Sequence, residues 1–258
     1  MTHRIAELQA PAHWRAVDFV SDLHLQASDA ATAHVWRHYL QTHPSERADA
    51  LFILGDLFEV WVGDDVLLDP RSFASTCAAL VRTYSRHTPV FFLHGNRDFL
   101  LGEAAAQAFG MVILEDPCVL ELPQGRCLLS HGDALCLDDT EYQRFRTLVR
   151  APAWRTSFLS RSLQEREDTA RGIRNQSEAR KQVNPPNRWA DADTQAVLEG
   201  LKKAAADTLI HGHTHRPAHH DLGEGRSRIV LSDWDAHALP PRAEVLRWNA
   251  SGFHRLPL

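Results

Sequence analysis

The chain has 258 residues, of which 44% are hydrophobic and 24% charged, and its formal net charge is −5 at pH 7. This length and apolar content fit one medium-sized globular domain with a sizeable core. No apolar run approaches the ~20 residues that span a bilayer, and the first eight residues lack the apolar run of a signal peptide. The four cysteines show no CxxC spacing, which argues against a disulfide framework and for a reducing compartment.

Strands and helices are predicted to alternate from Asp18 to His131. Apolar runs indicate the strands, which are expected at residues 18–20, 50–54, 90–93, 127–129, 208–210, 229–231 and 243–248. Residues before Asp18 are expected to form a short extension outside these elements. A helix is predicted over residues 69–87, with Pro70 near its start, and a shorter one over residues 103–109.

Glycines mark two expected ends of elements. Gly110 follows the shorter helix and is expected to terminate it. Gly223-Glu224-Gly225 predicts a hairpin turn in the second half of the chain.

Side chains of the kinds that bind metal ions follow five of the apolar runs. Each run ends in a small residue and then in a carboxylate, an amide or an imidazole. Because ligands of α/β sheets bind beyond the carboxyl ends of the strands, we expect these side chains to converge on one place. They are Asp22, His24, Asp56, Asn96, His131, His213 and His215.

The most specific motif is Gly212-His213-Thr214-His215, close behind the strand expected at 208–210. Imidazole is a common metal ligand, and residues two apart in an extended segment point the same way, so His213 and His215 can face one ion. Histidines near a strand end can equally be surface residues, and aspartate or serine there can start a turn or cap a helix. The joint occurrence of five motifs favours a metal site.

The expected ligands mix hard oxygen donors with imidazoles and include no cysteine. Such a set suits manganese, iron(II), zinc or similar ions, and seven side chains exceed what one ion needs. Two octahedral ions that share a bridge fit the set, and Asp56 is the natural bridge because a carboxylate has several lone pairs. His211 is expected to be structural, and Asp98 either orients a neighbouring group or caps its turn.

In this order, the motifs Asp-x-His, Gly-Asp, Gly-Asn-x-Asp, His-Gly-Asp and Gly-His-x-His resemble the calcineurin-like metallophosphoesterase superfamily. Most of its members have a histidine where this chain has Arg97. Together with the blocks at 55–59, 61–65 and 139–142, Arg97 makes the sequence similar to the family of UDP-2,3-diacylglucosamine pyrophosphatases, hydrolases of lipid A biosynthesis. The resemblance runs from about Asp18 onward and is loose between 151 and 189.

The resemblance implies an α/β fold, namely a calcineurin-like metallophosphoesterase β-sandwich flanked by helices. It implies one domain over 1–258 with a helical cap insertion at about 139–200. It also implies two divalent metal ions per chain, with Mn²⁺ as the expected ion. The first ion is expected to bind Asp22, His24, Asp56 and His215, and the second Asp56, Asn96, His131 and His213.

The implied reaction is attack of hydroxide on the α-phosphorus of UDP-2,3-diacylglucosamine, which gives UMP and 2,3-diacylglucosamine 1-phosphate (lipid X). Arg97 cannot act as a general acid because a guanidinium keeps its proton, but its planar fork suits a bidentate contact with phosphate. Asp139 can equally be a helix N-cap. The implied catalytic residues are Asn96, Arg97 and His131, and the implied substrate-binding residues are Asn96, Arg97, Asp139, Tyr142, Ser177, Lys181, Asn184 and His213.

Residues 140–188 differ from the rest of the chain in charge. They contain eleven Lys/Arg and five Asp/Glu, a net charge of +6 in a chain of −5. One interpretation is a cap that holds acyl chains with its apolar face and anionic membrane lipid with its basic face. The other is two amphipathic helices that pack on the core. The apolar residues in question are Trp154, Phe158, Leu159, Leu163 and Ile173.

These inferences predict a monomeric hydrolase bound peripherally to the cytoplasmic face of the inner membrane. Nucleic acid is not expected as a partner, because the acidic remainder of the chain would repel a polyanion. The alternative is another dinuclear-metal phosphodiesterase or phosphatase, acting on cyclic nucleotides or phosphoproteins; Arg97 and the basic insertion count against it. A non-catalytic module is a third hypothesis, but such a module would be expected to have lost ligands.

Overall fold

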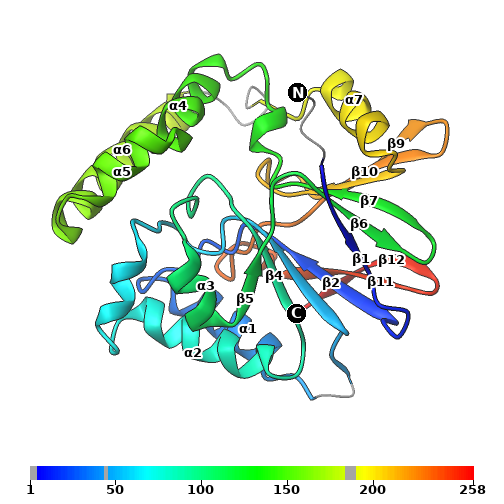
Figure 1. The fold of residues 1–258 in the computed structure, drawn as a ribbon, viewed down its shortest axis with the longest axis horizontal. Helices are drawn as coiled ribbons and strands as arrows, with labels where there is room; N and C mark the ends of the chain where they lie inside the picture. Colours follow the sequence, from blue (N-terminus) through cyan, green and yellow to red (C-terminus); the bar gives the residue numbers. More distant parts are fainter. Residues whose placement is uncertain (1–4, 44–45, 184–189) are drawn as a thin grey trace.

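The computed structural model describes residues 5–43, 46–183 and 190–258, without the side chains of 176–183. Two six-stranded sheets form its centre (Figure 1). In spatial order the first contains β1 (Ala6–Gln9), β6 (Cys118–Leu122), β7 (Gly125–Leu129), β8 (Thr208–His211), β10 (Arg226–Val230) and β9 (Ala218–Gly223). The second contains β12 (Gly252–Pro257), β11 (Glu244–Asn249), β2 (Ala16–Val20), β3 (Ala50–Leu54), β4 (Val90–Leu93) and β5 (Met111–Ile113).

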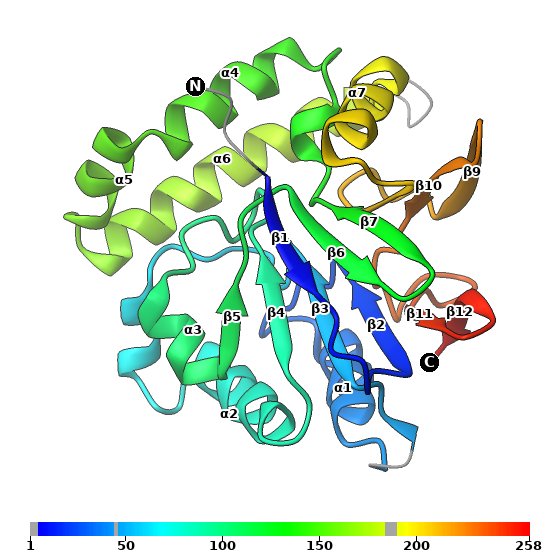
Figure 2. The same ribbon diagram turned by 45° about the vertical axis from the view of Figure 1, so that its right-hand side comes forward.

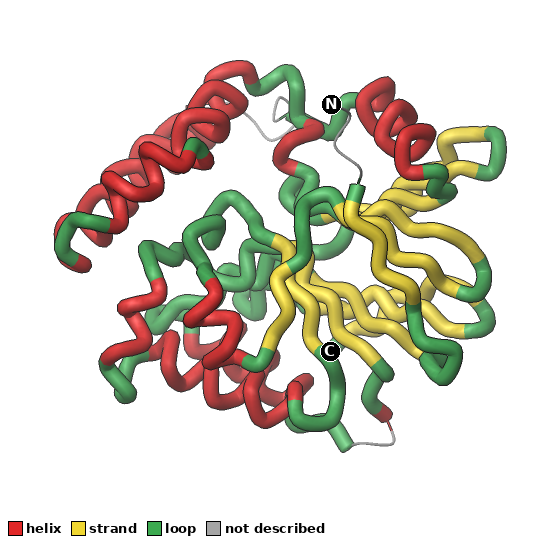
Figure 3. The backbone as a smooth tube through the Cα atoms, in the orientation of Figure 1, coloured by secondary structure: helices red, strands yellow, loops and turns green. Residues whose placement is uncertain are grey.

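Helices lie outside the two sheets (Figure 3). The outer face of the second sheet carries α1 (Ala30–Leu40), α2 (Phe73–Ser85) and α3 (Glu103–Phe109), and that of the first carries α7 (Thr194–Ala204). Short 3₁₀ helices are η2 (Asp64–Leu68) and η3 (Asp133–Leu135). A separate group of helices, seen at the upper left of Figure 1, contains α4 (Thr140–Arg150), α5 (Pro152–Leu159) and α6 (Leu163–Val183).

The space between the sheets is filled by apolar side chains from both. Phe19 and Phe52 of the second sheet stack with ring centroids 5.4 Å apart, and they share a core with Leu129 and Ile210 of the first sheet. All four side chains are fully buried. Two further cores lie under the helices on the outer faces. The expected α/β fold, a β-sandwich flanked by helices, is therefore confirmed.

Parallel pairing brings five strand ends together. β2, β3 and β4 run parallel in one sheet, and β7 and β8 run parallel in the other. Main-chain hydrogen bonds join the loops that leave these strands: the Asp22 N–H donates to the Gly55 carbonyl over 3.1 Å, and the Gly212 N–H donates to the His131 carbonyl over 3.0 Å. The loops that carry the expected metal ligands are thus neighbours.

A buried ion pair fastens β11 to β2. Asp18 is fully buried in β2, and the Arg247 guanidinium of β11 donates to both of its carboxylate oxygens, over 2.7 and 2.8 Å. The Tyr39 hydroxyl of α1 donates to the same carboxylate over 2.8 Å. Because a buried charge is costly unless it is paired and hydrogen-bonded, this network holds β2 in the second sheet.

The group α4–α6 consists of three helices rather than the two expected, and part of it packs on the core. Phe158 is buried at 4% exposure, and Trp154 stacks on it with ring centroids 4.7 Å apart. Leu163 packs against the same core. By contrast, the side chains of Leu159 and Ile173 are 40% and 38% exposed. The packing interpretation therefore accounts for Trp154, Phe158 and Leu163. It does not account for Leu159 and Ile173, whose apolar side chains are partly exposed to solvent.

Arg166 anchors α6 to η2. Its side chain is buried at 2% exposure, its Nη1 donates to the Val62 carbonyl over 2.6 Å, and its guanidinium makes a two-pronged ion pair with Asp65. The neighbouring Asp64 accepts hydrogen bonds from the Gly102 and Ala105 N–H groups at the start of α3. The block at 61–65 is therefore structural.

Three local expectations were wrong. Residues before Asp18 include β1, which pairs in parallel with β6; a strand of four residues is too short to show a period in the sequence. The alternation ends at β5, because β6 and β7 form an antiparallel pair instead of enclosing a helix. The helix expected from residue 69 begins at Phe73, since the Ser72 side chain accepts from the Ser75 N–H and caps it.

Other local expectations are confirmed. Gly110 ends α3 in the left-handed conformation, and the chain turns between β9 and β10 at residues 223–226. The four cysteines are free and buried. Among the helices that the structure describes, none has the length and apolar content that crossing a bilayer requires.

Candidate active site

Five loops at one edge of the sandwich carry the expected metal ligands. The loop after β2 carries two of them, the loops after β3, β4 and β7 carry one each, and the loop after β8 carries two. Five of these non-glycine residues have positive φ angles, between 49° and 64°. Such angles are uncommon for non-glycine residues and concentrate at functional sites. They belong to Asp22, His24, Asp56, His213 and His215.

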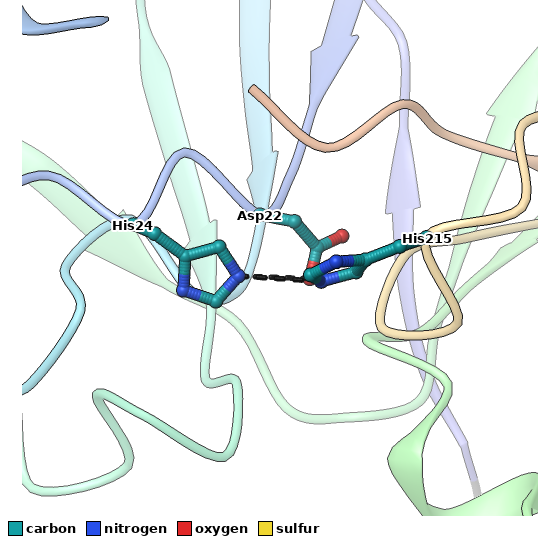
Figure 4. Close-up of side chains that lie close together, drawn as sticks. All are labelled: Asp22, His24 and His215. Carbon is teal, nitrogen blue, oxygen red and sulfur yellow. Dashed lines mark hydrogen bonds and ion pairs between the residues drawn. The ribbon is translucent and has the colours of Figure 1, made fainter. Parts of the chain in front are cut away.

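The first group of ligand atoms contains Asp22, His24 and His215 (Figure 4). The Nε2 atoms of the two imidazoles face each other at 3.3 Å. Asp22 Oδ1 lies 3.4 Å from His215 Nε2 and 4.0 Å from His24 Nε2. Two atoms bound to one ion at about 2.1 Å are about 3.0–3.4 Å apart in octahedral or tetrahedral geometry. The closer spacings therefore fit a shared cation.

The second group contains Asn96, His131 and His213, with Asp56 beside it. Asn96 Oδ1 lies 3.1 Å from His131 Nε2 and 2.8 Å from His213 Nδ1. Asp56 Oδ2 lies 3.7 Å from His131 Nε2. One ligand atom each from Asp22, Asp56 and His131 lie within 4.8 Å of one another, so the two groups adjoin.

The hydrogen bonding of the Asp22 carboxylate indicates whether a cation fits the site. Its Oδ2 accepts from the Ser21 hydroxyl over 2.6 Å and from the His213 main-chain N–H over 2.9 Å. Its Oδ1 is buried, has no hydrogen-bond donor among the residues that the structure describes, and faces the imidazoles of His24 and His215. A buried carboxylate oxygen without a donor is costly, and a cation at this point would satisfy it. The donor set and the orphaned oxygen both fit a divalent metal.

Outer groups fix how the imidazoles point. Glu59 Oε2 lies 3.0 Å from His24 Nδ1, and Asp233 Oδ2 lies 3.6 Å from His215 Nδ1. His131 Nδ1 donates to the Leu54 carbonyl over 2.9 Å. In a neutral ring whose Nδ1 carries the proton, the Nε2 lone pair would face the site, as a metal ligand requires. Carboxylates and carbonyls of this kind commonly orient histidine ligands.

Asp98 supports the loop that carries Asp56. It is fully buried and accepts from the main-chain N–H groups of Gly95 over 2.9 Å and Leu57 over 2.7 Å. It also lies 3.3 Å from the Asp56 nitrogen. Asp98 thus has both of the expected roles: it caps its own turn and it orients the loop that carries Asp56. Its surroundings, burial and the Asp56 charge, raise its pKa to about 7.

Buried carboxylates shift the pKa values of the imidazoles at the site. Burial alone would lower the pKa of His131, but the negative charges of Asp56, Asp22 and Asp133 raise it to about 9. Burial and the positive charge of His131 lower the pKa of His213 to about 3. Burial alone would lower the pKa of His24 as well, but Glu59, Asp56 and Asp22 raise it. Carboxylates that favour positive charge on two neighbouring imidazoles are electrostatically suited to a cation.

Asp133 connects the site to α4. It is fully buried, and its Oδ2 accepts from the Tyr142 hydroxyl over 2.5 Å and from Arg146 Nε over 2.8 Å. Arg150 Nη2 donates to the Gly95 carbonyl over 3.0 Å. The Tyr142 ring lies 5.7 Å from that of His213. The start of the α4–α6 group therefore contacts the second ligand group.

The expected substrate contacts fall in different places. Arg97 lies at the site, with Nη1 3.5 Å from Glu59 Oε1, and Tyr142 is beside His213. Asp139 is exposed and caps α4 by accepting from the Tyr142 N–H over 3.0 Å. Ser177 and Lys181 belong to the part of α6 whose side chains are not described, and Asn184 lies outside the described residues.

Three site residues were not assigned from the sequence: Glu59, Asp133 and Asp233. Glu59 lies three residues after Asp56 and Asp133 lies two residues after His131, so closeness to an expected metal ligand was the signal in the sequence that could have identified them. Asp233 follows β10, in a run with no metal-type pattern. Burial alone would raise the pKa of Glu59, but the His24 hydrogen bond and the charges of Arg97 and Arg174 lower it to about 2.

Comparison with known proteins agrees with this geometry. The family described as calcineurin-like phosphoesterase matches residues 16–217. The chain is 43% identical over 249 residues to a UDP-2,3-diacylglucosamine hydrolase of Bordetella pertussis, covering 95% of this chain and 94% of that one. It is 46% identical over 239 residues to the protein of that name from Aromatoleum aromaticum, covering 91% and 93%.

A third relative has the same name. It comes from Chromobacterium violaceum and is 42% identical over 243 residues, covering 94% of this chain and 99% of that one. Both the family match and the relatives span most of the chain. The protein therefore belongs to the calcineurin-like phosphoesterase family, in the group of the UDP-2,3-diacylglucosamine hydrolases.

Proposed function

We propose that the protein hydrolyses the pyrophosphate bond of UDP-2,3-diacylglucosamine in lipid A biosynthesis. The products are UMP and 2,3-diacylglucosamine 1-phosphate. The observation that carries the proposal is the pair of adjoining ligand groups around Asp22 and Asp56, in a chain 42–46% identical over most of its length to hydrolases named for this substrate. Cyclic-nucleotide or phosphoprotein substrates have no comparable support.

The ligand groups define what the chain contributes to the reaction. Two divalent ions held there supply positive charge for the phosphoryl oxygens and acidify water enough to yield a nucleophile at neutral pH. Asp22, His24 and His215 would hold the first ion, and Asn96, His131 and His213 would hold the second. Asp56, whose Oδ2 lies 3.7 Å from His131 Nε2, would be shared by the two ions.

The bonds change at the α-phosphorus. A hydroxide oxygen would form a bond to this phosphorus while the bond from the phosphorus to the bridging oxygen breaks, and the sugar 1-phosphate would depart with the electron pair of the broken bond. Arg97 is proposed to contact a pair of phosphate oxygens through the planar fork of its guanidinium. A phosphate leaving from an anhydride needs less help from an acid than an alkoxide, so the site can dispense with the histidine usual in the family. Tyr142, beside His213, lies where a substrate contact is possible.

Mn²⁺ is the proposed ion, because imidazole ligands suit it better than Mg²⁺. We place the enzyme, as a monomer, peripherally on the cytoplasmic face of the inner membrane. The α4–α6 group is proposed as a cap over the site. Its support is the position of α4 against the second ligand group and the exposed apolar side chains of Leu148, Leu159 and Ile173, which are 57%, 40% and 38% exposed. Acyl chains would cover them.

The deciding experiment is incubation of the purified protein with UDP-2,3-diacylglucosamine and Mn²⁺, with UMP and lipid X read by mass. Asp56→Asn removes charge but not volume, and it should abolish turnover. Asp207→Asn, an exposed carboxylate at the start of β8, is the matched control and should be neutral. No product from the wild-type protein, or equal activity in both variants, would refute the proposal.

A further inference from the structure

Glu59 gathers three cationic or protonated groups on one carboxylate. It stands in the loop after β3, and its side chain is 10% exposed. One oxygen, Oε2, lies 3.0 Å from His24 Nδ1. The other, Oε1, lies 3.1 Å from Arg174 Nε and 3.5 Å from Arg97 Nη1.

The two oxygens therefore serve two different parts of the molecule. Through Oε2, Glu59 makes an ion-pair contact with His24 Nδ1, and the Nε2 atom of that ring is turned toward Asp22 and His215. Through Oε1 it holds Arg174, which stands on α6 and reaches no other described group except Gln26, 3.5 Å away. Rotation of the carboxylate to follow one partner would move it away from the other, and the attraction between opposite charges falls as their separation grows.

We propose that Glu59 is a positioning residue that couples the orientation of the His24 imidazole to the placement of α6 beside the site. An ion that fixes His24 would fix Glu59 and thereby hold Arg174 and its helix. A helix held by Arg174 would in turn favour ion binding. Binding linkage is reciprocal. This inference rests on the metal site of the proposed function but not on its substrate.

The chain contains a matched comparison. Asp65 also fastens α6, through Arg166, but it contacts no expected metal ligand. Asp65→Asn should therefore loosen α6 without disturbing His24. Glu59→Gln should do both, and Arg174→Met should release α6 from Glu59 while the His24 contact stays. Arg174 is 41% exposed, so its replacement costs little packing.

The test uses Mn²⁺ alone. Hydrogen exchange of residues 163–175 is measured with and without the ion, and Mn²⁺ affinity is measured by competition with a chelator. In the wild-type protein, Mn²⁺ should slow exchange in α6 by about 5-fold or more. The slowing should be lost in Glu59→Gln and Arg174→Met and kept in Asp65→Asn, where exchange is faster overall.

Affinity gives the second measurement. Glu59→Gln should bind Mn²⁺ about 10-fold more weakly, as is usual for loss of an outer carboxylate, and Asp65→Asn should bind as the wild type does. The proposal is overturned if Mn²⁺ leaves α6 exchange unchanged in the wild type, if it still slows exchange in Arg174→Met, or if Glu59→Gln binds Mn²⁺ normally.

Two failures remain distinguishable. If the wild-type protein does not bind Mn²⁺, the metal site of the proposed function fails. If it binds Mn²⁺ and shows the coupling but does not cleave UDP-2,3-diacylglucosamine, only the substrate assignment fails. Should Glu59→Gln not fold, Arg174→Met alone still decides, because its exchange either keeps or loses the response to Mn²⁺.

Discussion

Gly95→Ala is a single-methyl change aimed at the proposed bridge. A Cβ at Gly95 would stand 2.0 Å from Asp56 Oδ1 and 2.3 Å from the Asp56 nitrogen. Real Cβ atoms essentially never approach closer than 3.0 Å, so the Asp56 carboxylate or the loop after β4 must move by about 1 Å. A misplacement of that size at a reacting site can cost about 10²-fold in rate.

The expected result is a fall of about 10²-fold in kcat for UDP-2,3-diacylglucosamine at saturating Mn²⁺. Overpacking should also lower the free energy of unfolding by about 1–3 kcal/mol, measured by urea titration. Gly172→Ala is the control, because a Cβ there meets no described atom within 4 Å. In the middle of α6 it should stabilise by about 0.5–1 kcal/mol and leave the rate unchanged.

A wild-type rate in Gly95→Ala would refute this reasoning, because it would mean that Asp56 need not hold its place. A lost rate with weaker Mn²⁺ binding and an intact fold would support it. The rate is measured at a temperature where circular dichroism shows the variant to be folded, so that a loss of rate caused by unfolding is not mistaken for a displaced Asp56.

Arg97→Ala should still bind Mn²⁺ but lose about 10²–10³-fold in kcat, as when one electrostatic donor is removed; weaker Mn²⁺ binding with a normal rate would contradict this role. The double variant Leu159→Ser, Ile173→Ser should slow hydrolysis of the diacylated substrate far more than that of a small phosphodiester, because each covered methylene contributes about 0.8 kcal/mol. The melting temperature should hardly change. Equal losses of rate on the two substrates would contradict an acyl contact. Burial alone would raise the pKa of Asp133, but the positive charges of His131, Arg150 and Arg146 hold it well below its usual range. The Asp133 carboxylate therefore contributes its full stabilisation above its unfolded pKa of about 4, and this contribution is lost as the pH falls below that value. In Asp133→Asn, the free energy of unfolding should decline less steeply on the acid side than in the wild type. A decline as steep as that of the wild type would argue against the ion pairs of Asp133.

The sequence predicted the ligand loops well because each is a local pattern. An apolar run followed by His213-Thr214-His215 or Ser21-Asp22 can be recognised within ten residues, and parallel pairing then places the strand ends together. β1 escaped prediction because four residues alternate too briefly to be distinguished from a loop. Its partner β6 lies far along the chain, and no local feature of Ala6–Gln9 indicates that pairing.

The outer groups of the site depend on contacts that no local pattern encodes. Glu59 meets Arg174, and Asp133 meets Tyr142 and Arg146, across separate elements. An acidic residue near a ligand motif has many possible reasons to be there, and only the fold selects among them. The exposure of Leu159 and the burial of Phe158 likewise could not be separated, since both are apolar residues in one amphipathic stretch.

The ion pair between Asp18 and Arg247 bears on the order in which the molecule can assemble during synthesis. The two residues are 229 positions apart, so a ribosome delivers β2 long before β11. Until then β2 has an open edge and an unpaired acid at its centre, and open edges of this kind invite pairing with other chains. Asp22 lies two residues beyond the end of β2, so the strand that leads to this metal ligand is paired on both sides only once residues 244–249 have emerged.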